Sequence, residues 1–350
     1  MNSKRLIFSR QTGFSLMELM IAMTIGFIVV AGVGYLYLGS SQTFKAQDNL
    51  SAIQENSRFA LDTMSRDIRM AGYLGCGSLA SIPINNVTNV PHITIPVGGL
   101  QVYPGGAGWT APAGVTRVSG DVLSVASAQS SGVTVTGNMT VLTANIQIAG
   151  NVYGYLAGTA LIVSDCQNAD VFQATGVSSS AGVVTVAHAA NLNAHNFLSK
   201  LYGTTSPPAQ VYSLQQTDYF LGCPTASWAA GQCNVPVALY QVINNGVPQP
   251  LVDNVENMAF SLGVGAGQVV TPPYQSPTQV AAASNWAHVL TVQVNLLMVG
   301  SPAKDAASNV GVVSQPYNFI VNGATYATYP ADWRMRQAVV ATIAIRNHLP

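Results

Sequence analysis

The sequence predicts an α+β protein. One long N-terminal helix, transmembrane in its first half, packs on an antiparallel β-rich head with a large β-rich insertion. Three observations lead to this class. Residues 14–38 are almost wholly apolar, apolar residues then recur at helical spacing as far as Gly72, and short strand-like runs separated by Gly, Pro, Ser and Asn fill the chain after Tyr73. One helix followed by many strands is typical of α+β proteins.

The first half of the helix has the length of a membrane span. Leu19–Leu38 is an uncharged run of 20 residues, and such a helix is about 30 Å long, like the hydrocarbon core of a bilayer. Lys4, Arg5 and Arg10 precede it without an acid, which predicts a cytoplasmic N-terminus with the rest of the chain across the membrane. A removed secretory signal peptide is the alternative. It predicts a shorter apolar stretch and an A-x-A-like site, which residues 39–41 do not provide.

The helix is expected to continue beyond the membrane to Ala71, with Gly72 as its stop. Arg58 and Asp62, and likewise Asp62 and Arg66, are opposite charges four residues apart. An apolar stripe at steps of three and four, apart from one longer gap, predicts one face packed on a sheet of the same chain. The stripe comprises Phe44, Leu50, Ile53, Ser57, Ala60, Leu61, Met64 and Ile68.

Charge is scarce. Thirteen Lys and Arg balance thirteen Asp and Glu, and charged residues make up 7% of the chain, against about 25% in typical globular proteins. This argues against a nucleic-acid partner bound by broad charge neutralisation. The hydrophobic fraction of 49% argues against a disordered polyelectrolyte. The neutral surface, rich in amides and hydroxyls, can pack against other subunits without burying many charges.

The region after Tyr73 is expected to be β-rich. Residues 103–109 and 268–278 are expected to be exposed loops, and residues 79–215 an insertion or expanded loop region. Gly105–Gly108 is expected to be a loop rather than a phosphate cradle, because prolines flank it and a cradle needs a following helix. The expected strands are Val122–Ala126, Val133–Thr136, Ala160–Ser164, Val171–Thr175, Val183–Ala187, Tyr219–Leu221, Val237–Val242, Val255–Leu262, His288–Val299 and Val339–Ile345.

Glu18 does not fit a plain membrane anchor, because a carboxylate near the membrane costs a few kcal/mol unless it is paired or interfacial. An interfacial Glu near the helix end is the plainer interpretation. The sequence around Glu18 is more specific: a basic leader, then Gly13-Phe14-Ser15-Leu16-Met17-Glu18, then twenty apolar residues. This resembles the type IV prepilin signature, which type II secretion pseudopilins share.

The resemblance implies that a prepilin peptidase cleaves after Gly13 on the cytoplasmic side and that the new N-terminal Phe14 is N-methylated. Glu18 becomes the acidic fifth residue of the mature chain, implied to serve subunit assembly. Many major pilins have a helix-weakening Pro about twenty residues into the mature chain. This chain has none there, only glycines at 26, 32 and 34.

Further stretches resemble one minor-pilin family, PilW. They are residues 55–62, 66–73, 75–76, 164–166, 255–258 and 346–347. The resemblance divides the chain into a leader (1–13), a transmembrane half-helix (14–38), a periplasmic half-helix (39–72) and a pilin-like head (73–350) that contains the insertion at 79–215.

The PilW resemblance implies a low-abundance subunit that helps to initiate type IV pilus assembly and lies at the filament tip. Its implied partners are other minor pilins, the major pilin, the prepilin peptidase and the inner-membrane assembly machinery. It would be a single-pass inner-membrane protein with a periplasmic head, and then part of a cell-surface pilus used in adhesion and twitching motility. A minor pseudopilin of a type II secretion system is the alternative, which genomic neighbourhood would separate.

Four cysteines lie beyond the membrane segment, Cys76, Cys166, Cys223 and Cys233. An even count in an oxidising compartment predicts two disulfides, and four cysteines allow three pairings. We favour Cys223–Cys233, which closes a short loop, and hence Cys76–Cys166. Buried free thiols are the alternative; a zinc site would prefer closely spaced pairs, which the sequence lacks.

Neither an enzyme nor a cofactor is predicted. The histidines at 92, 188, 195, 288 and 348 share no ligand spacing, and no G-x-S-x-G, H-E-x-x-H or Walker motif is present. We therefore expect no catalytic residue and no metal site. Asp165 and Asp170 flank Cys166 and could help to hold Ca²⁺, but turn capping is the simpler role. The tryptophans at 109, 228, 286 and 333 could form a ligand patch for an adhesin, with core packing preferred for most of them.

Overall fold

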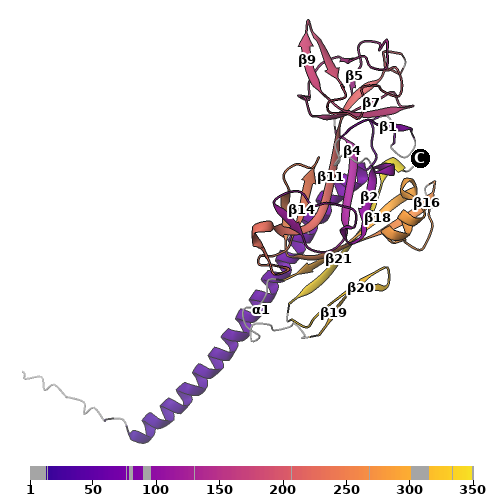
Figure 1. The fold of residues 1–350 in the computed structure, drawn as a ribbon. Helices are drawn as coiled ribbons and strands as arrows, with labels where there is room; N and C mark the ends of the chain where they lie inside the picture. The colour runs from indigo at the N-terminus through magenta and orange to yellow at the C-terminus, as the bar shows by residue number, and fades with distance from the viewer. Residues whose placement is uncertain are drawn as a thin grey trace, which may run out of the picture.

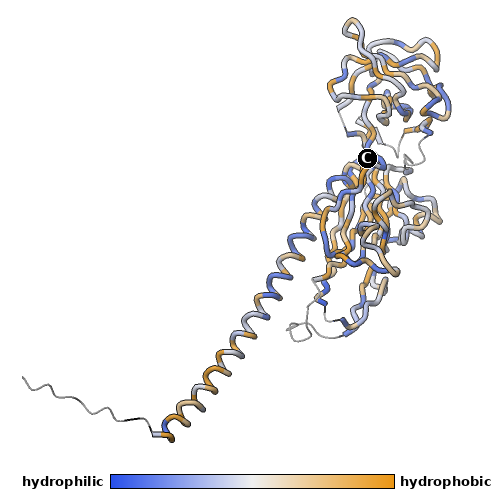
Figure 2. Tube along the Cα trace, turned by 60° about the vertical axis from the view of Figure 1, so that its left-hand side comes forward, coloured by the Kyte–Doolittle hydropathy of each residue, from blue (hydrophilic) through white to orange (hydrophobic). Residues whose placement is uncertain are grey.

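The computed structural model describes residues 13, 15–75, 77–78, 82–89, 96–129, 131–205, 207–267, 269–300, 315–332 and 334–348. Helix α1 (Leu16–Met70) runs from one end of the molecule into a β-rich head. Its first half projects from the head as a bare, apolar shaft (Figures 1 and 2). The predicted α+β class is confirmed.

Helix α1 ends where the sequence predicts. Gly72 adopts a φ of +73°, and its amide donates to the Ala126 carbonyl at 2.9 Å. A Cβ at Gly72 would lie 2.7 Å from the Gly98 carbonyl oxygen, so only glycine lets the chain turn this close to the next segment.

The predicted apolar stripe is confirmed only in its upper part. Ile53, Ser57, Ala60, Met64 and Ile68 are buried against the head. Phe44 and Leu50 remain 71% and 38% exposed. The expectation that these two residues pack on the head was therefore wrong.

The strands of the described part of the head form five sheets. The ten-stranded sheet contains β1 (Ile84–Asn86), β2 (Leu100–Tyr103), β3 (Val115–Arg117), β4 (Val122–Ala128), β5 (Val133–Thr134), β7 (Ala160–Ser164), β8 (Ala169–Gln173), β11 (Gln210–Pro224), β14 (Ala238–Ile243) and β15 (Gln249–Asp253). A three-stranded sheet has the order β6 (Ile146–Ile148), β10 (Val183–Ala187), β9 (Gly176–Ser180). A four-stranded sheet has the order β17 (Val269–Val270), β16 (Val255–Ala266), β18 (Val289–Val299), β21 (Arg336–Ala344). Two hairpins pair β12 (Trp228–Ala229) with β13 (Gln232–Cys233) and β19 (Tyr317–Val321) with β20 (Ala324–Tyr329).

The short helices are α2 (Pro277–Ala282), η1 (Val97–Gly99), η2 (Pro104–Gly106), η3 (Thr225–Ser227), η4 (Trp286–His288) and η6 (Arg346–His348). Among the described strands, all pairs are antiparallel except β1 with β8, which is parallel. The antiparallel head that the sequence predicts is therefore present.

The two largest apolar clusters among the described residues mark a proximal body and a distal body of the head. In the proximal body, helix α1, the four-stranded sheet and strands β2, β4, β11 and β14 bury one continuous apolar cluster. The distal body has its own cluster, formed by Val87 and residues between Val133 and Val211. It lies beyond the C-terminal end of α1 (Figure 1). Strand β11 joins the bodies, because Gln210–Ser213 pair with β7 and Leu214–Tyr219 pair with β4.

The separate core is narrower than the insertion expected at 79–215. Leu100, Val102, Leu123 and Val125 lie within that range but pack with α1 in the proximal core. The extent of an insertion therefore stays a proposal. The distal core contains Val87 and residues from Val133 to Val211, so it favours a range narrower than 79–215.

Neither predicted loop is simply exposed. Residues 103–109 contain η2, and the Trp109 ring packs 4.8 Å from Phe220. Residues 268–278 contain β17 and the start of α2, where Pro277 is buried. The Gly- and Pro-rich composition of these segments marks their turns but does not reveal that they fold back onto the sheets.

Candidate functional site: the exposed helix and its attachment to the head

The first turn of α1 carries a capping box. The Ser15 backbone N–H donates to Glu18 Oε2 at 3.2 Å, and Ser15 Oγ accepts from the Met17 N–H at 3.3 Å. The spacing S-x-x-E is what this motif requires, because it brings the N3 carboxylate back to the N-cap amide. Both residues follow the expected cleavage point, so the mature chain would keep its cap.

Of the expected processing residues, Gly13 is exposed and Phe14 lies outside the described residues. The third expected site residue, Glu18, already accepts the capping hydrogen bond from Ser15 of its own chain. Any role between subunits would be additional to this bond. The sequence contains the signal for this cap, because Ser15 and Glu18 have the S-x-x-E spacing of a capping box.

The apolar half of α1 is not covered by any part of the chain that the structure describes. It is the one described helix long and apolar enough to cross a membrane, and none of its most apolar 18-residue window is buried. Phe27 is 75% exposed and Tyr35 80% exposed. A bare apolar surface of this length needs lipid or other apolar helices around it. Tyr35 and Tyr37 end the run with aromatic residues, as is common at membrane interfaces.

The other half of α1 is joined to the head through Asp67. Its Oδ2 accepts 2.6 Å and 3.4 Å hydrogen bonds from Tyr219 Oη on β11 and Gln241 Nε2 on β14. Burial raises the pKa of Asp67, although these donors and the Arg66 charge oppose the shift. Burial and the neighbouring Asp67 charge also raise the pKa of Tyr219. The pair therefore fixes the helix to the ten-stranded sheet.

The C-terminal segment closes over the upper end of the helix. Asn347 Nδ2 donates to the Ala71 carbonyl at 3.2 Å. The two ring nitrogens of His348 lie 2.7 Å from the Val289 carbonyl oxygen and 2.5 Å from that of Gly98. Chain end, helix end and η1 are thus held together.

Asp121 connects three segments of the proximal body. It is almost fully buried and accepts hydrogen bonds from the Gly105 N–H (2.9 Å), Tyr326 Oη (2.7 Å) and the Phe260 N–H (3.2 Å). Burial raises its pKa against the effect of these donors. Asp121 therefore links η2, the four-stranded sheet and the β19–β20 hairpin.

An ion-pair network fixes the start of β21. The Arg336 side chain, 3% exposed, binds Glu256 with two hydrogen bonds of 2.5 and 2.9 Å and Asp332 with two of 2.6 and 2.7 Å. Its guanidinium also lies 5.1 Å from the Tyr329 ring centre. Burial opposes the charge, but the two carboxylates outweigh it and raise the pKa of Arg336.

The structure contains the Cys223–Cys233 disulfide, the pairing that the sequence favoured. Cys166 is also disulfide-bonded. Cys76 lies outside the described residues, so the Cys76–Cys166 pairing stays a prediction. The first disulfide ties the end of β11 to the small β12–β13 hairpin.

The residues considered for metal or ligand binding are dispersed. Asp165 Oδ1 accepts from the Gln167 and Asn168 N–H groups, which is the turn-capping role, and its Oδ2 pairs with Lys200. Asp170 accepts instead from Asn85, Ser199 and Tyr202. Within the described part of the chain, no three His, Cys, Asp or Glu residues group as metal ligands would. His92 and Trp333 lie outside that part, whereas Trp286 packs partly buried against the proximal core.

Sequence reasoning did not single out Asp67, Tyr219, Asp121 or Arg336. Asp67 lies within residues 66–73, one of the stretches that carry the PilW resemblance. No local pattern announces a hydrogen bond between residues 152 positions apart, such as that between Asp67 and Tyr219.

Two family models match the chain. The prokaryotic N-terminal methylation motif covers residues 8–34, and the type IV pilus-assembly protein W model, PilW, covers residues 235–347. No curated protein and no solved structure matches it significantly. The methylation motif includes the start of an exposed apolar helix, and this helix continues into a β-rich head. These features define a type IV pilin-like protein. Together with the methylation motif, the match of residues 235–347 to the PilW model supports a PilW-type type IV pilin.

Proposed function

We propose that this protein is a minor pilin that helps to initiate type IV pilus assembly and is incorporated at the filament tip. The carrying observation is the helix: its apolar half is uncovered, and its capped first turn would survive processing intact. Such a helix can exchange lipid for the helices of neighbouring subunits. We further propose a structural rather than catalytic role, as for the PilW family in general.

The distal body supports the tip position. It extends beyond the C-terminal end of α1, away from the membrane-spanning end (Figure 1). In a filament whose helices stack in parallel, subunits added earlier occupy the space on that side. A subunit at the tip has none above it, so an enlarged head is accommodated there without a clash.

Before assembly, the head would lie in the periplasm and the shaft in the inner membrane. Partners would be other minor pilins, the major pilin, the prepilin peptidase and the assembly machinery. Glu18 would offset a methylated Phe14 amine of a neighbouring subunit or of its own chain.

The test is gene deletion with complementation by a tagged full-length chain. We expect fewer pili per cell without the gene, and immunogold label at filament ends in the complemented strain. Normal piliation with the tagged chain absent from sheared filaments would contradict the proposal. Normal pili with a defect in protein secretion would favour the secretion-pseudopilin alternative.

A further inference from the structure

Strand β21 is an edge without protection. Its nine residues pair with β18 in one uninterrupted register, and no described strand pairs with its other side. Between Gln337 and Ala344 it contains no charge, proline or glycine. Ala338, Val340, Thr342 and Ala344 are exposed. Natural proteins usually guard such edges with charges, prolines, bulges or short length, because open backbone groups recruit further strands.

Other sheet edges of this head do carry those devices. β17, at the opposite edge of the same sheet, has two residues. β15, an edge of the ten-stranded sheet, contains Pro250 and Asp253 and a break in register. Between Gln337 and Ala344, β21 has none of the protecting features that these two edges carry. Its single charge, Arg336, is already bound to Glu256 and Asp332.

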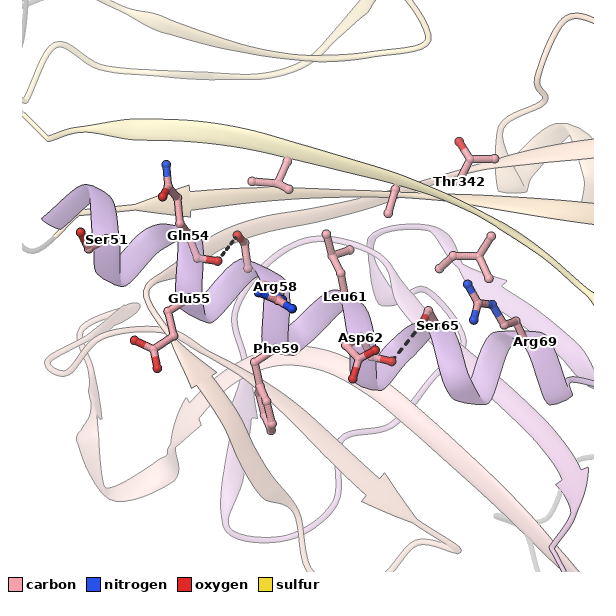
Figure 3. A pocket seen from close by; sticks show the side chains of 14 residues that line it. Ser51, Gln54, Glu55, Arg58, Phe59, Leu61, Asp62, Ser65, Arg69 and Thr342 are labelled. Atoms are coloured by element: carbon pink, nitrogen blue, oxygen red, sulfur yellow. Dashed lines mark hydrogen bonds between the residues drawn. The ribbon is translucent and has the colours of Figure 1, made fainter. Parts of the chain in front are cut away.

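A groove of about 1090 Å³ opens beside this edge, between α1 and β21. Val339, Ala341 and Ile343 line its β21 side, and Leu61 lies opposite on the helix (Figure 3). Phe59 also lines the groove and is 53% exposed. A fifth strand would lie about 4.8 Å from β21 and place alternate side chains against this helix face.

The direction of β21 excludes a second copy paired edge to edge in antiparallel fashion. The start of β21 lies near Asn49. The Gly300 N–H donates to the Met335 carbonyl at 2.8 Å, and a Cβ placed at Gly300 would lie 3.8 Å from the Asn49 Cβ. Its far end leads to Asn347, which binds Ala71. Strand and helix therefore run the same way. A two-fold pairing of β21 strands would point the two membrane helices in opposite directions, which two copies anchored in one membrane cannot adopt.

We propose that β21 receives an extended segment of a different pilus subunit as the fifth strand of the four-stranded sheet. The segment carries small or apolar side chains at alternate positions toward the groove. Glu55, Arg58, Asp62 and Arg69 line the helix side with both signs of charge, so the segment has little net charge. This inference rests on the proposed assembly function. The experiments below distinguish a failure of strand addition at β21 from a failure of the proposed function.

The first measurement is photo-crosslinking in living cells, with a benzophenone amino acid at Val340 or Thr342 of the full-length chain. We expect an adduct whose partner peptide maps to one extended segment of another pilus subunit. No adduct in either membranes or filaments overturns the inference, as does an adduct with a second copy. The adduct could also form in membranes while the chain never reaches filaments. That result would support docking at β21 and contradict the proposed tip position.

The second measurement is amide hydrogen exchange. We expect β21 amides that exchange freely in the purified chain to slow at least about tenfold in sheared filaments, because a strand partner bonds them. The β15 amides serve as the internal control. Equal exchange rates of the β21 amides in the purified chain and in filaments would overturn strand addition. This holds even if side chains of another subunit pack against the groove.

Ala341→Lys places a charge in the groove, with Ala266→Lys on the exposed end of β16 as the matched control. We expect filament incorporation to fall several-fold only for Ala341→Lys, with the Cys223–Cys233 disulfide intact in both variants. Equal incorporation of the two variants would count against the inference. The crosslinking and exchange experiments use the wild-type groove and so do not depend on the folding of either variant.

Discussion

The Tyr219 hydroxyl donates a 2.6 Å hydrogen bond to the Asp67 carboxylate, joining helix α1 to the middle of the ten-stranded sheet. Tyr219 is fully buried, and Gln241 contacts both partners, at 3.1 Å from Tyr219 Oη and 3.4 Å from Asp67 Oδ2. The helix is therefore held to the head by a specific polar contact as well as by its apolar stripe.

Tyr219→Phe should lower the free energy of unfolding by about 1–3 kcal/mol, because the half-buried Asp67 loses its shortest donor. Urea denaturation of the full chain in detergent measures this. Tyr274→Phe, on a tyrosine remote from the helix, is a control expected to change stability less. Equal unfolding midpoints for Tyr219→Phe and wild type would contradict the importance of the contact.

Asp67 also predicts a pH dependence. Its pKa in the folded chain is raised above the ordinary 3.8, so the folded state holds more protons than the unfolded state between these two pKa values. Stability from this group is present below about pH 4 and is lost as pH rises through the raised pKa. Asp67→Asn removes this titration. The stability difference between variant and wild type should therefore shift in favour of the variant from pH 4 upward and then level off. A difference independent of pH between 4 and 8 would refute the assignment.

Gly13→Val should leave the chain uncleaved in the inner membrane, because a larger side chain does not fit a tight protease site beside the membrane. Mass spectrometry of the wild-type chain should show methylated Phe14 as the first residue. Intact Met1 in cells that express the prepilin peptidase would contradict the expected processing.

Glu18 has two roles that substitutions can separate. Glu18→Ala removes both the cap and the charge, whereas Glu18→Gln keeps a capping side chain and removes only the charge. If the carboxylate offsets a buried amine, its loss leaves a penalty of roughly 3–5 kcal/mol. Both variants should then be processed and folded but poorly incorporated into pili, with Glu18→Asp intermediate. Wild-type incorporation of Glu18→Gln at matched expression would show that capping alone suffices.

The disulfides should stabilise the head unequally. A bridge typically contributes about 2–4 kcal/mol and more for longer loops, so loss of the predicted Cys76–Cys166 link should cost more than loss of Cys223–Cys233. Non-reducing peptide mapping should recover both linked peptides. Four alkylatable thiols in the native protein, or a Cys76–Cys223 peptide, would disprove the pairing.

The sequence was sufficient for the elements whose signal is local. α1 follows from its apolar run and the helical spacing after it, and β7 and β10 match their predicted bounds to the residue. β11 was predicted only at Tyr219–Leu221 but spans Gln210–Pro224. The polar residues before Tyr219 hide the strand pattern in the sequence. In the structure, partners distant in sequence form hydrogen bonds with these residues.

Gln216 Nε2 donates to Ser124 Oγ at 3.0 Å, and Trp109 Nε1 donates to Asp218 at 3.0 Å. The β19–β20 hairpin was missed because four of the six residues of β20 are exposed and give no burial pattern. At the site, Glu18 could be identified from its motif. The attachment through Asp67 could not, since it depends on how two remote elements meet.

Strand β11 has a mechanical consequence. It is one continuous strand that begins in the distal body and runs through the proximal body. It pairs first with β7 and then with β4 and β14. A pull on the distal body along β11 loads those ladders in shear, so their hydrogen bonds share the tension instead of opening one after another. Force on the distal body thus passes along β11 into the ten-stranded sheet. It then reaches helix α1 through the hydrogen bond between Tyr219 and Asp67.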